Sequence, residues 1–204
     1  MDKQYADSLK CNIIDFFVAQ NPSVLIGNEI MYGSNKKVVD LLAIENRRII
    51  AIEIKSAHDS TYRLQKQIEE YMKVFDKVYI FSSCNKIDKI LNMTPSCIGV
   101  YEITDKYIRP IRRGTILKQQ SKSEMLSSMN LKFLRSKFNI QYNLDSDQVR
   151  ELLKKRGIQT IHQALLEYYT QRIKAAFNSY MNDRGKHSIV DDLTTLSPMS
   201  IVTD

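Results

Sequence analysis

Three charged residues near the middle of the chain have the types and spacing needed for metal-assisted hydrolysis. Asp40 lies in the apolar run KVVDLLAI, and Glu53 and Lys55 lie in the next one, RRIIAIEIKS. Along a β-strand, residues i and i+2 point to the same face, so Glu53 and Lys55 share a face with Ala51. Charges on a buried strand are unfavourable unless a partner compensates them. The pattern indicates either a surface ion pair or the edge of a functional site.

The turn between these two strands decides whether Asp40 and Glu53 meet. A two-residue turn at Asn46-Arg47 places Asp40 directly opposite Glu53, and a turn at Glu45-Asn46 places it diagonally on the same face. A three-residue turn sends Asp40 to the other face. Opposed carboxylates repel each other, whereas Mg²⁺ favours one or two carboxylates together with water and phosphate oxygens. A divalent cation between the two strands is therefore our hypothesis.

The spacing of Asp40, twelve residues, and then Glu53–Lys55 resembles the core motif of the PD-(D/E)XK nuclease superfamily, with Val39 in place of the usual proline. The following segment QIEEY, Gln67–Tyr71, is similar to the Q-x-x-x-Y element of the exonuclease-like branch. Residues four apart share one face of a helix. The resemblance covers about residues 5–112.

The resemblance implies a restriction-endonuclease-like α/β core, a mixed sheet flanked by helices, with metal-dependent hydrolysis of phosphodiester bonds, most naturally in DNA. It implies that Asp40, Glu53 and the backbone carbonyl of Ile54 hold Mg²⁺ or Mn²⁺. Lys55 then lies beside the attacking water, and Gln67 and Tyr71 help to hold the nucleic-acid strand or Lys55. Such nucleases act in repair, recombination or defence against foreign DNA.

Some members of the superfamily have one more acidic residue that assists the metal. Glu29, in GNEIMYG, is our candidate, ahead of Asp7 and Asp15. Structural interpretations stay open for three of these residues. Glu53 and Lys55 could form a surface ion pair worth under ~1 kcal/mol, and Tyr71 could be a core residue.

The hydrophobic periodicity predicts the order helix, three strands, helix, strand, helix, strand, strand up to residue 113, and helices afterwards. Segment 123–138 is predicted as one helix, and Asp59 or Ser60 as the N-cap of the helix that carries QIEEY. We divide the chain into a nuclease-like α/β core (1–115), a helical C-terminal region (116–186) and a flexible tail (187–204).

The net charge of +7 is concentrated in one part of the chain. Residues 106–137 contain nine basic residues and one acidic residue, Glu124, which favours either a phosphate-facing surface or a solvated face. Candidate nucleic-acid contacts are Arg63, Lys66, Arg109, Arg112 and Arg113. The apolar runs are too short to span a bilayer and the chain opens with polar residues, so we expect a cytoplasmic protein without a membrane partner.

Two other functional classes compete with a nuclease. One is a nucleic-acid-binding module on a nuclease fold that no longer cuts. The other is an interaction module in which the C-terminal helices bind a protein partner or a second copy of the chain. Metal-dependent cleavage of DNA by the wild type, lost on substitution of Glu53, separates the nuclease from both.

Overall fold

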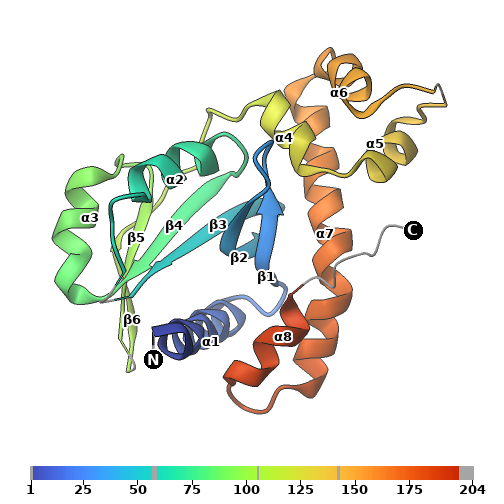
Figure 1. Cartoon of the computed structure of the whole chain (residues 1–204). Coiled ribbons are helices and arrows are strands. Elements are labelled where there is room, and N and C mark those ends of the chain that lie inside the picture. Colours follow the sequence, from blue (N-terminus) through green and yellow to red (C-terminus); the bar gives the residue numbers. More distant parts are fainter. Residues whose placement is uncertain (1, 57–58, 105, 142, 198–204) are drawn as a thin grey trace.

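A six-stranded mixed sheet forms the centre of the protein (Figure 1). The computed structural model describes residues 2–56, 59–104, 106–141 and 143–197. The strands follow one another in chain order across the sheet: β1 (Leu25–Tyr32), β2 (Lys37–Glu45), β3 (Arg48–Lys55), β4 (Lys77–Ser82), β5 (Gly99–Ile103) and β6 (Ile108–Arg112). The first three form an antiparallel meander, β3, β4 and β5 run parallel, and β6 closes the sheet antiparallel to β5. The expected α/β architecture is confirmed at this level.

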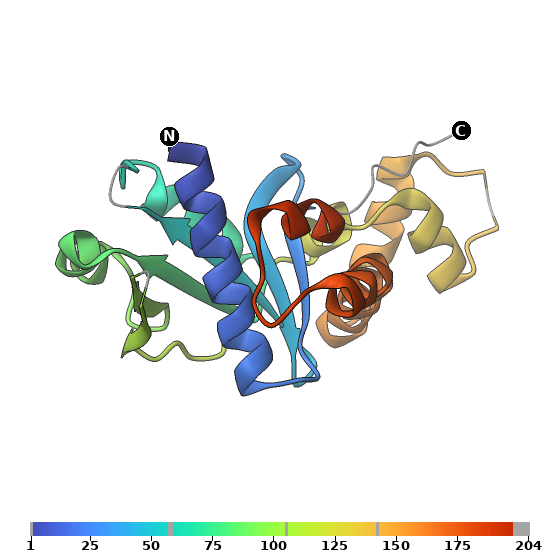
Figure 2. The same cartoon turned by 90° about the horizontal axis from the view of Figure 1, so that it is seen from below.

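Helices cover both faces of the sheet (Figures 1 and 2). One face carries α1 (Asp2–Gln20), and the other carries α2 (Leu64–Met72) and, after the 3₁₀ turn η1 (Cys84–Lys86), α3 (Ile87–Met93). The C-terminal region consists of α4 (Lys122–Ser128), α5 (Leu131–Phe138), α6 (Ser146–Lys154), the long α7 (Ile158–Asp183), η2 (Val190–Asp192) and α8 (Leu193–Leu196). Helix α7 runs along the β1 edge of the sheet.

Two hydrophobic clusters lie on the two sides of the sheet, and α7 contributes to both. The cluster under α2 contains Ile49 and Ala51 of β3, together with Ile161 and other residues of the first part of α7. The cluster under α1 contains the alternate residues of β3, together with Phe177 and Tyr180 from the end of α7. Because alternate residues of a strand face opposite sides of the sheet, the isoleucines of β3 are divided between the two clusters.

The turn between β2 and β3 has two residues, which sets the register on which the site depends. Glu45 pairs with Arg48, and the central residues Asn46 and Arg47 have φ values of 49° and 60°. Two successive positive φ values are typical of a type I′ hairpin turn. The ladder continues to Leu41 opposite Ile52. The ladder ends there, and the next residue of β2, Asp40, accepts the Ile54 N–H through its side chain.

Three local features differ from expectation. The segment predicted as a single helix breaks between α4 and α5, where the Asn130 side chain accepts the Phe133 N–H at 2.7 Å and starts a new helix. Helix α2 begins at Leu64, with Arg63 in the N-cap position in place of Asp59 or Ser60. Those two side chains bond instead within the loop before α2, to the N–H groups of Ser56 and Tyr62.

The segment after residue 187 is packed where the structure describes it. The Ser188 N–H donates to the Asp15 carboxylate of α1, and Leu196 of α8 is fully buried under the sheet. The tail that we expected to be flexible thus contains a docked segment, and residues 198–204 lie outside the described part. Over the described residues, none of the helices has both the length and the apolar character required to cross a membrane.

Candidate active site

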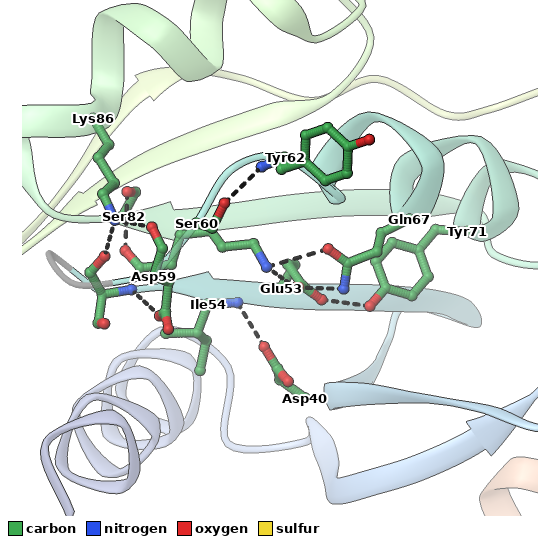
Figure 3. Close-up of polar contacts among 12 residues, drawn as sticks. Asp40, Glu53, Ile54, Asp59, Ser60, Tyr62, Gln67, Tyr71, Ser82 and Lys86 are labelled. Atoms are coloured by element: carbon green, nitrogen blue, oxygen red, sulfur yellow. Dashed lines mark hydrogen bonds and ion pairs between the residues drawn. The ribbon is translucent and has the colours of Figure 1, made fainter. Parts of the chain in front are cut away.

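Glu53 lies at the centre of a hydrogen-bonded cluster between β3 and α2 (Figure 3). Its side chain is almost fully buried, with 2% of the residue exposed. The Lys55 Nζ donates to Glu53 Oε1 at 2.6 Å, and the Gln67 Nε2 donates to the same oxygen at 2.9 Å. The Tyr71 hydroxyl donates to Oε2. These three donors compensate the buried carboxylate.

The Q-x-x-x-Y residues reach Glu53 because α2 crosses over the C-terminal half of β3. Gln67 and Tyr71 are one helical turn apart, and Ile68 and Leu64 anchor the same helix in the core. Gln67 also accepts a bond from Lys55 through Oε1 at 3.2 Å. The amide therefore fixes both members of the Glu53–Lys55 pair. Burial and the nearby Glu53 raise the pKa of Tyr71 far above its ordinary value, so its hydroxyl remains a donor.

Asp40 enters the same site from β2, where the ladder with β3 ends. The Ile54 N–H donates to Asp40 Oδ2 at 2.8 Å, so the side chain takes the position of a backbone acceptor. Burial raises the pKa of the Asp40 carboxyl to about 7, and the neighbouring Glu53 contributes to the rise. The Ile54 N–H, Lys10 and Lys55 act in the opposite direction. Burial therefore outweighs the Ile54 N–H and the two lysines in setting the pKa of Asp40.

Lys10 of α1 is a further buried cation beside Asp40, with 7% of the residue exposed. Its Nζ lies 3.0 Å from Glu29 Oε1 and 3.6 Å from Asp7 Oδ1. Glu29 itself is exposed, has a φ of 54°, and turns its carboxylate to Lys10. Glu29 and Asp7, the first two candidates for the additional acidic residue, are therefore both paired with the ammonium group of Lys10, close to Asp40. Asp15, the third, bonds to Ser188 and Arg184.

The donor set of this site fits a hard divalent cation. Asp40 accepts the Ile54 N–H through Oδ2, which leaves Oδ1 for another partner. Among the described residues, no group of three or more His, Cys, Asp or Glu side chains is placed to hold a metal. Mg²⁺ does not require such a group, because it is commonly bound by one or two carboxylates with water.

The candidate nucleic-acid residues lie in different places. Arg63 and Lys66 are exposed at the start of α2, and Arg113 is exposed after β6. The Arg109 guanidinium pairs with Glu102 at 2.6 Å. Lys55, Ser82, Glu102 and Arg109 are successive partners across β3 to β6, which places Arg109 in the same row as Lys55, three strands or about 14 Å away.

Arg112 has an internal role. Its guanidinium donates to the backbone carbonyl of Ile98 at 2.8 Å and to the carbonyls of Leu91 and Thr94 at the end of α3. Partial burial lowers its pKa. These bonds occupy the guanidinium of Arg112 within the protein.

Three residues around the site had no distinguishing signal in the sequence. Lys10 is one lysine of an ordinary amphipathic helix. The Lys86 Nζ donates to the carbonyls of Ser56 and Asp59 and closes the loop between β3 and α2. Tyr62, with 90% of its residue exposed, stands beside that loop. An aromatic residue in the polar stretch STYR is the one hint that sequence offers for this position.

The fold and the site together define an α/β protein whose mixed sheet carries a buried cluster of acidic and basic groups. The chain matches the family of bacteriophage P4 protein cII over residues 1–197, and it belongs to that family. Protein cII of Enterobacteria phage P4 is 26% identical over 181 residues, which are 83% of this chain and 68% of that protein.

A solved structure also has a distant likeness to this chain. It is a protein of unknown function from Silicibacter pomeroyi, 16% identical, and the match covers 68% of this chain and 87% of that chain with a TM-score of 0.41.

Proposed function

We propose that this protein is a nuclease that depends on a divalent metal ion and has a core of the PD-(D/E)XK type. The observation that carries the proposal is that Asp40 of β2 accepts the N–H of Ile54, the residue after Glu53, at 2.8 Å, with Lys55 bonded to Glu53 at 2.6 Å. Sequence spacing alone permits other registers. The two-residue turn at Asn46-Arg47 supports the register in which Asp40 lies next to the end of β3 that carries Glu53.

Asp40, Glu53 and the Ile54 carbonyl would hold Mg²⁺ or Mn²⁺. When bound, such an ion supplies a Lewis acid for the phosphate and a water of lowered pKa. Lys55 Nζ, fixed by Glu53 and Gln67, would stabilise negative charge on the phosphate oxygens or take part in proton transfer from the water. Tyr71 and Gln67 would hold Glu53 in place through their bonds to its two oxygens.

DNA is the substrate that we propose. The net charge of +7 favours binding of a polyanion. Arg63 and Lys66 on α2 and Arg109 in the row of Lys55 lie on elements next to the site, where they would contact phosphates on either side of the cleaved bond. The helical region would form a wall for the substrate or bind a partner.

Cleavage assays with linear, circular and single-stranded DNA test the proposal. We expect the wild type to cut in Mg²⁺ or Mn²⁺ and not in EDTA. Glu53→Gln should lower the rate at least about a hundredfold, because it removes a charge that acts on the reacting groups. Glu69→Gln, an exposed carboxylate on α2, is the matched control and should cut normally.

Salt-sensitive DNA binding by a protein that does not cut would overturn the nuclease and support a binding module. If the protein neither binds nor cuts DNA, a role in protein interaction becomes the better explanation. Equal cleavage by wild type and Glu53→Gln would show that the activity comes from elsewhere.

A further inference from the structure

A polar cavity lies at the opposite end of β3 from Glu53. Its volume is about 510 Å³, which is within the range of small-molecule sites. Arg48 begins β3 and Lys55 ends it, so the cavity is about 20 Å from the candidate active site. It is lined by the turn between β2 and β3, the chain before α4, and the first turns of α7: Asn46, Arg47, Arg48, Asp76, Ile116, Leu117, Gln120, Met125, Ile158, Gln159, His162, Gln163 and Leu166.

Two arginines line this cavity. Arg47 and Arg48 come from the turn between β2 and β3, and His162 lines the cavity from α7. Asp76 is the one acidic side chain among the described lining residues, and its carboxylate is already used. It accepts the Ile49 N–H at 2.8 Å and contacts His162 Nε2 at 2.9 Å, and Arg48 lies 3.5 Å away. The side chains of this wall favour an anion.

The N-terminus of α7 adds to this preference. The helix is 26 residues long, its N-cap is Gly157, which has no side chain to cap it, and its first turn contains no acidic residue. Ile158 and Gln159, in that first turn, line the cavity. Unpaired N–H groups and the helix dipole make such an end favourable for phosphate.

Arg47 is held in a conformation that favours glycine. Its φ of 60° falls at the second central position of the type I′ turn, where glycine is the preferred residue. A strained residue on the rim of a cavity is a reason to look for a function of its side chain. Arg47 and the first turn of α7 line the same cavity.

Exposed apolar side chains also line the cavity. Ile116 and Ile158 are 46% and 41% exposed, which is unusual for large aliphatic residues, and both line this cavity with Leu166. The amides of Gln159 and Gln163 lie on the same helix turns. A ligand that matches both sides has a phosphate group joined to a flat, weakly polar ring with hydrogen-bonding edges.

We propose that this cavity binds a nucleoside monophosphate. The phosphate faces Arg47, Arg48 and the first turn of α7, and the base packs on Ile116 and Ile158 with the glutamine amides at its edge. Because the walls come from the β2–β3 turn and from α7, the ligand ties the helical region to the sheet. This site is independent of the nuclease proposal and would stand if that proposal failed.

Isothermal titration calorimetry with AMP, adenosine and inorganic phosphate tests the site on the full chain. We expect saturable binding of AMP. Adenosine and phosphate should bind more weakly, because adenosine lacks the phosphate group and phosphate lacks the base. Arg47→Gly should weaken AMP binding roughly tenfold, the loss expected for one charge-assisted hydrogen bond. Its melting temperature should stay equal or rise, because glycine suits this turn.

Lys36→Gly is the matched control. Lys36 is also a basic residue with a positive φ, 50°, in a hairpin turn, but it lies at the β1–β2 turn and its Nζ bonds to the Ser127 carbonyl. The Lys36→Gly variant should bind AMP with the same affinity as the wild type. Absence of AMP binding by the wild type in the millimolar range would overturn the proposal, as would equal affinities of Arg47→Gly and wild type.

Competition experiments distinguish two sources of the same phosphate chemistry. A short oligothymidylate with a 5′-phosphate that displaces AMP, while its unphosphorylated form does not, would identify the end of a strand as the ligand. Failure of both oligonucleotides to displace bound AMP would identify the free nucleotide.

Discussion

At the scale of single residues, the buried charge of Glu53 explains the arrangement of its neighbours. Lys55, Gln67 and Tyr71 donate to its two oxygens, and the cluster is nearly closed to solvent. Removing one partner from such a group leaves an uncompensated charge, which costs far more than the net value of the pair. These hydrogen bonds therefore hold the Glu53 carboxylate in one position.

Asp40→Asn should stabilise the protein when no divalent metal is present. The raised pKa of Asp40, about 7, means that the folded state prefers the protonated acid, so this contribution to stability is complete below about pH 4 and is lost as the pH rises through 7. Asparagine mimics the neutral form and can still accept the Ile54 N–H. In EDTA at pH 8, we expect the variant to be more stable by about 1–2 kcal/mol, and close to wild type at pH 4.

Thermal melts at both pH values, with and without Mg²⁺, measure this effect. Mg²⁺ should raise the melting temperature of the wild type and have little effect on Asp40→Asn, since a ligand stabilises the state that it binds. A variant less stable than wild type at pH 8 in EDTA would contradict the proposed repulsion between the two carboxylates.

Tyr71→Phe should destabilise the fold by about 1–3 kcal/mol, because it removes a donor from a buried carboxylate. Tyr32→Phe removes a hydroxyl from a ring 5.2 Å away in the same cluster and is the control. Urea unfolding measures both. If both variants lose the same stability, Tyr71 is an ordinary core residue, which is the other interpretation that its sequence position allows.

At the scale of elements, periodicity predicts most of this structure. The meander, the α2 helix and the edge strand with Pro110 follow from apolar alternation and turn residues. The break at Asn130 was not predicted, because its surroundings keep the helical spacing of apolar residues and hide the local capping bond from Asn130 to the Phe133 N–H. Lys10 was not predicted as part of the site, since its partners come from α1 and β1, whose packing no local pattern specifies.

The loop between β3 and α2 places an exposed aromatic ring near the site. If the protein binds single-stranded DNA, Tyr62 can stack on a base, and Tyr62→Ala should weaken binding by about 1–3 kcal/mol without changing stability. Tyr107→Ala, at a side chain 49% exposed before β6, is the comparison. Fluorescence anisotropy with labelled DNA measures both affinities. Equal losses would remove any special role for Tyr62.

At the scale of the whole molecule, the segment after α7 is part of the core. The Asn28 amide donates to the Leu193 carbonyl and to Ser197 Oγ at 3.0 Å, and α8 packs against β1. The weak periodicity of this segment suggested a flexible tail, since a four-residue helix is too short for a helical repeat to show.

Leu196→Ala should therefore lower the free energy of unfolding by about 2–5 kcal/mol, the usual effect of truncating a fully buried leucine. Ile189→Ala shortens a side chain that is 59% exposed in the same segment, and it should have little effect. Chemical denaturation measures the two values. If both variants are as stable as wild type, the docked segment contributes nothing to the fold.

The path of α7 also has a consequence for synthesis of the protein. One helix supplies Ile161 and Tyr169 to one core and Phe177 and Tyr180 to the other, so neither side of the sheet is sealed until the ribosome has made this late segment. The earlier strands would leave the exit tunnel with exposed apolar faces that attract chaperones. Stalled or prematurely terminated chains should accumulate as insoluble material even though they contain the entire sheet.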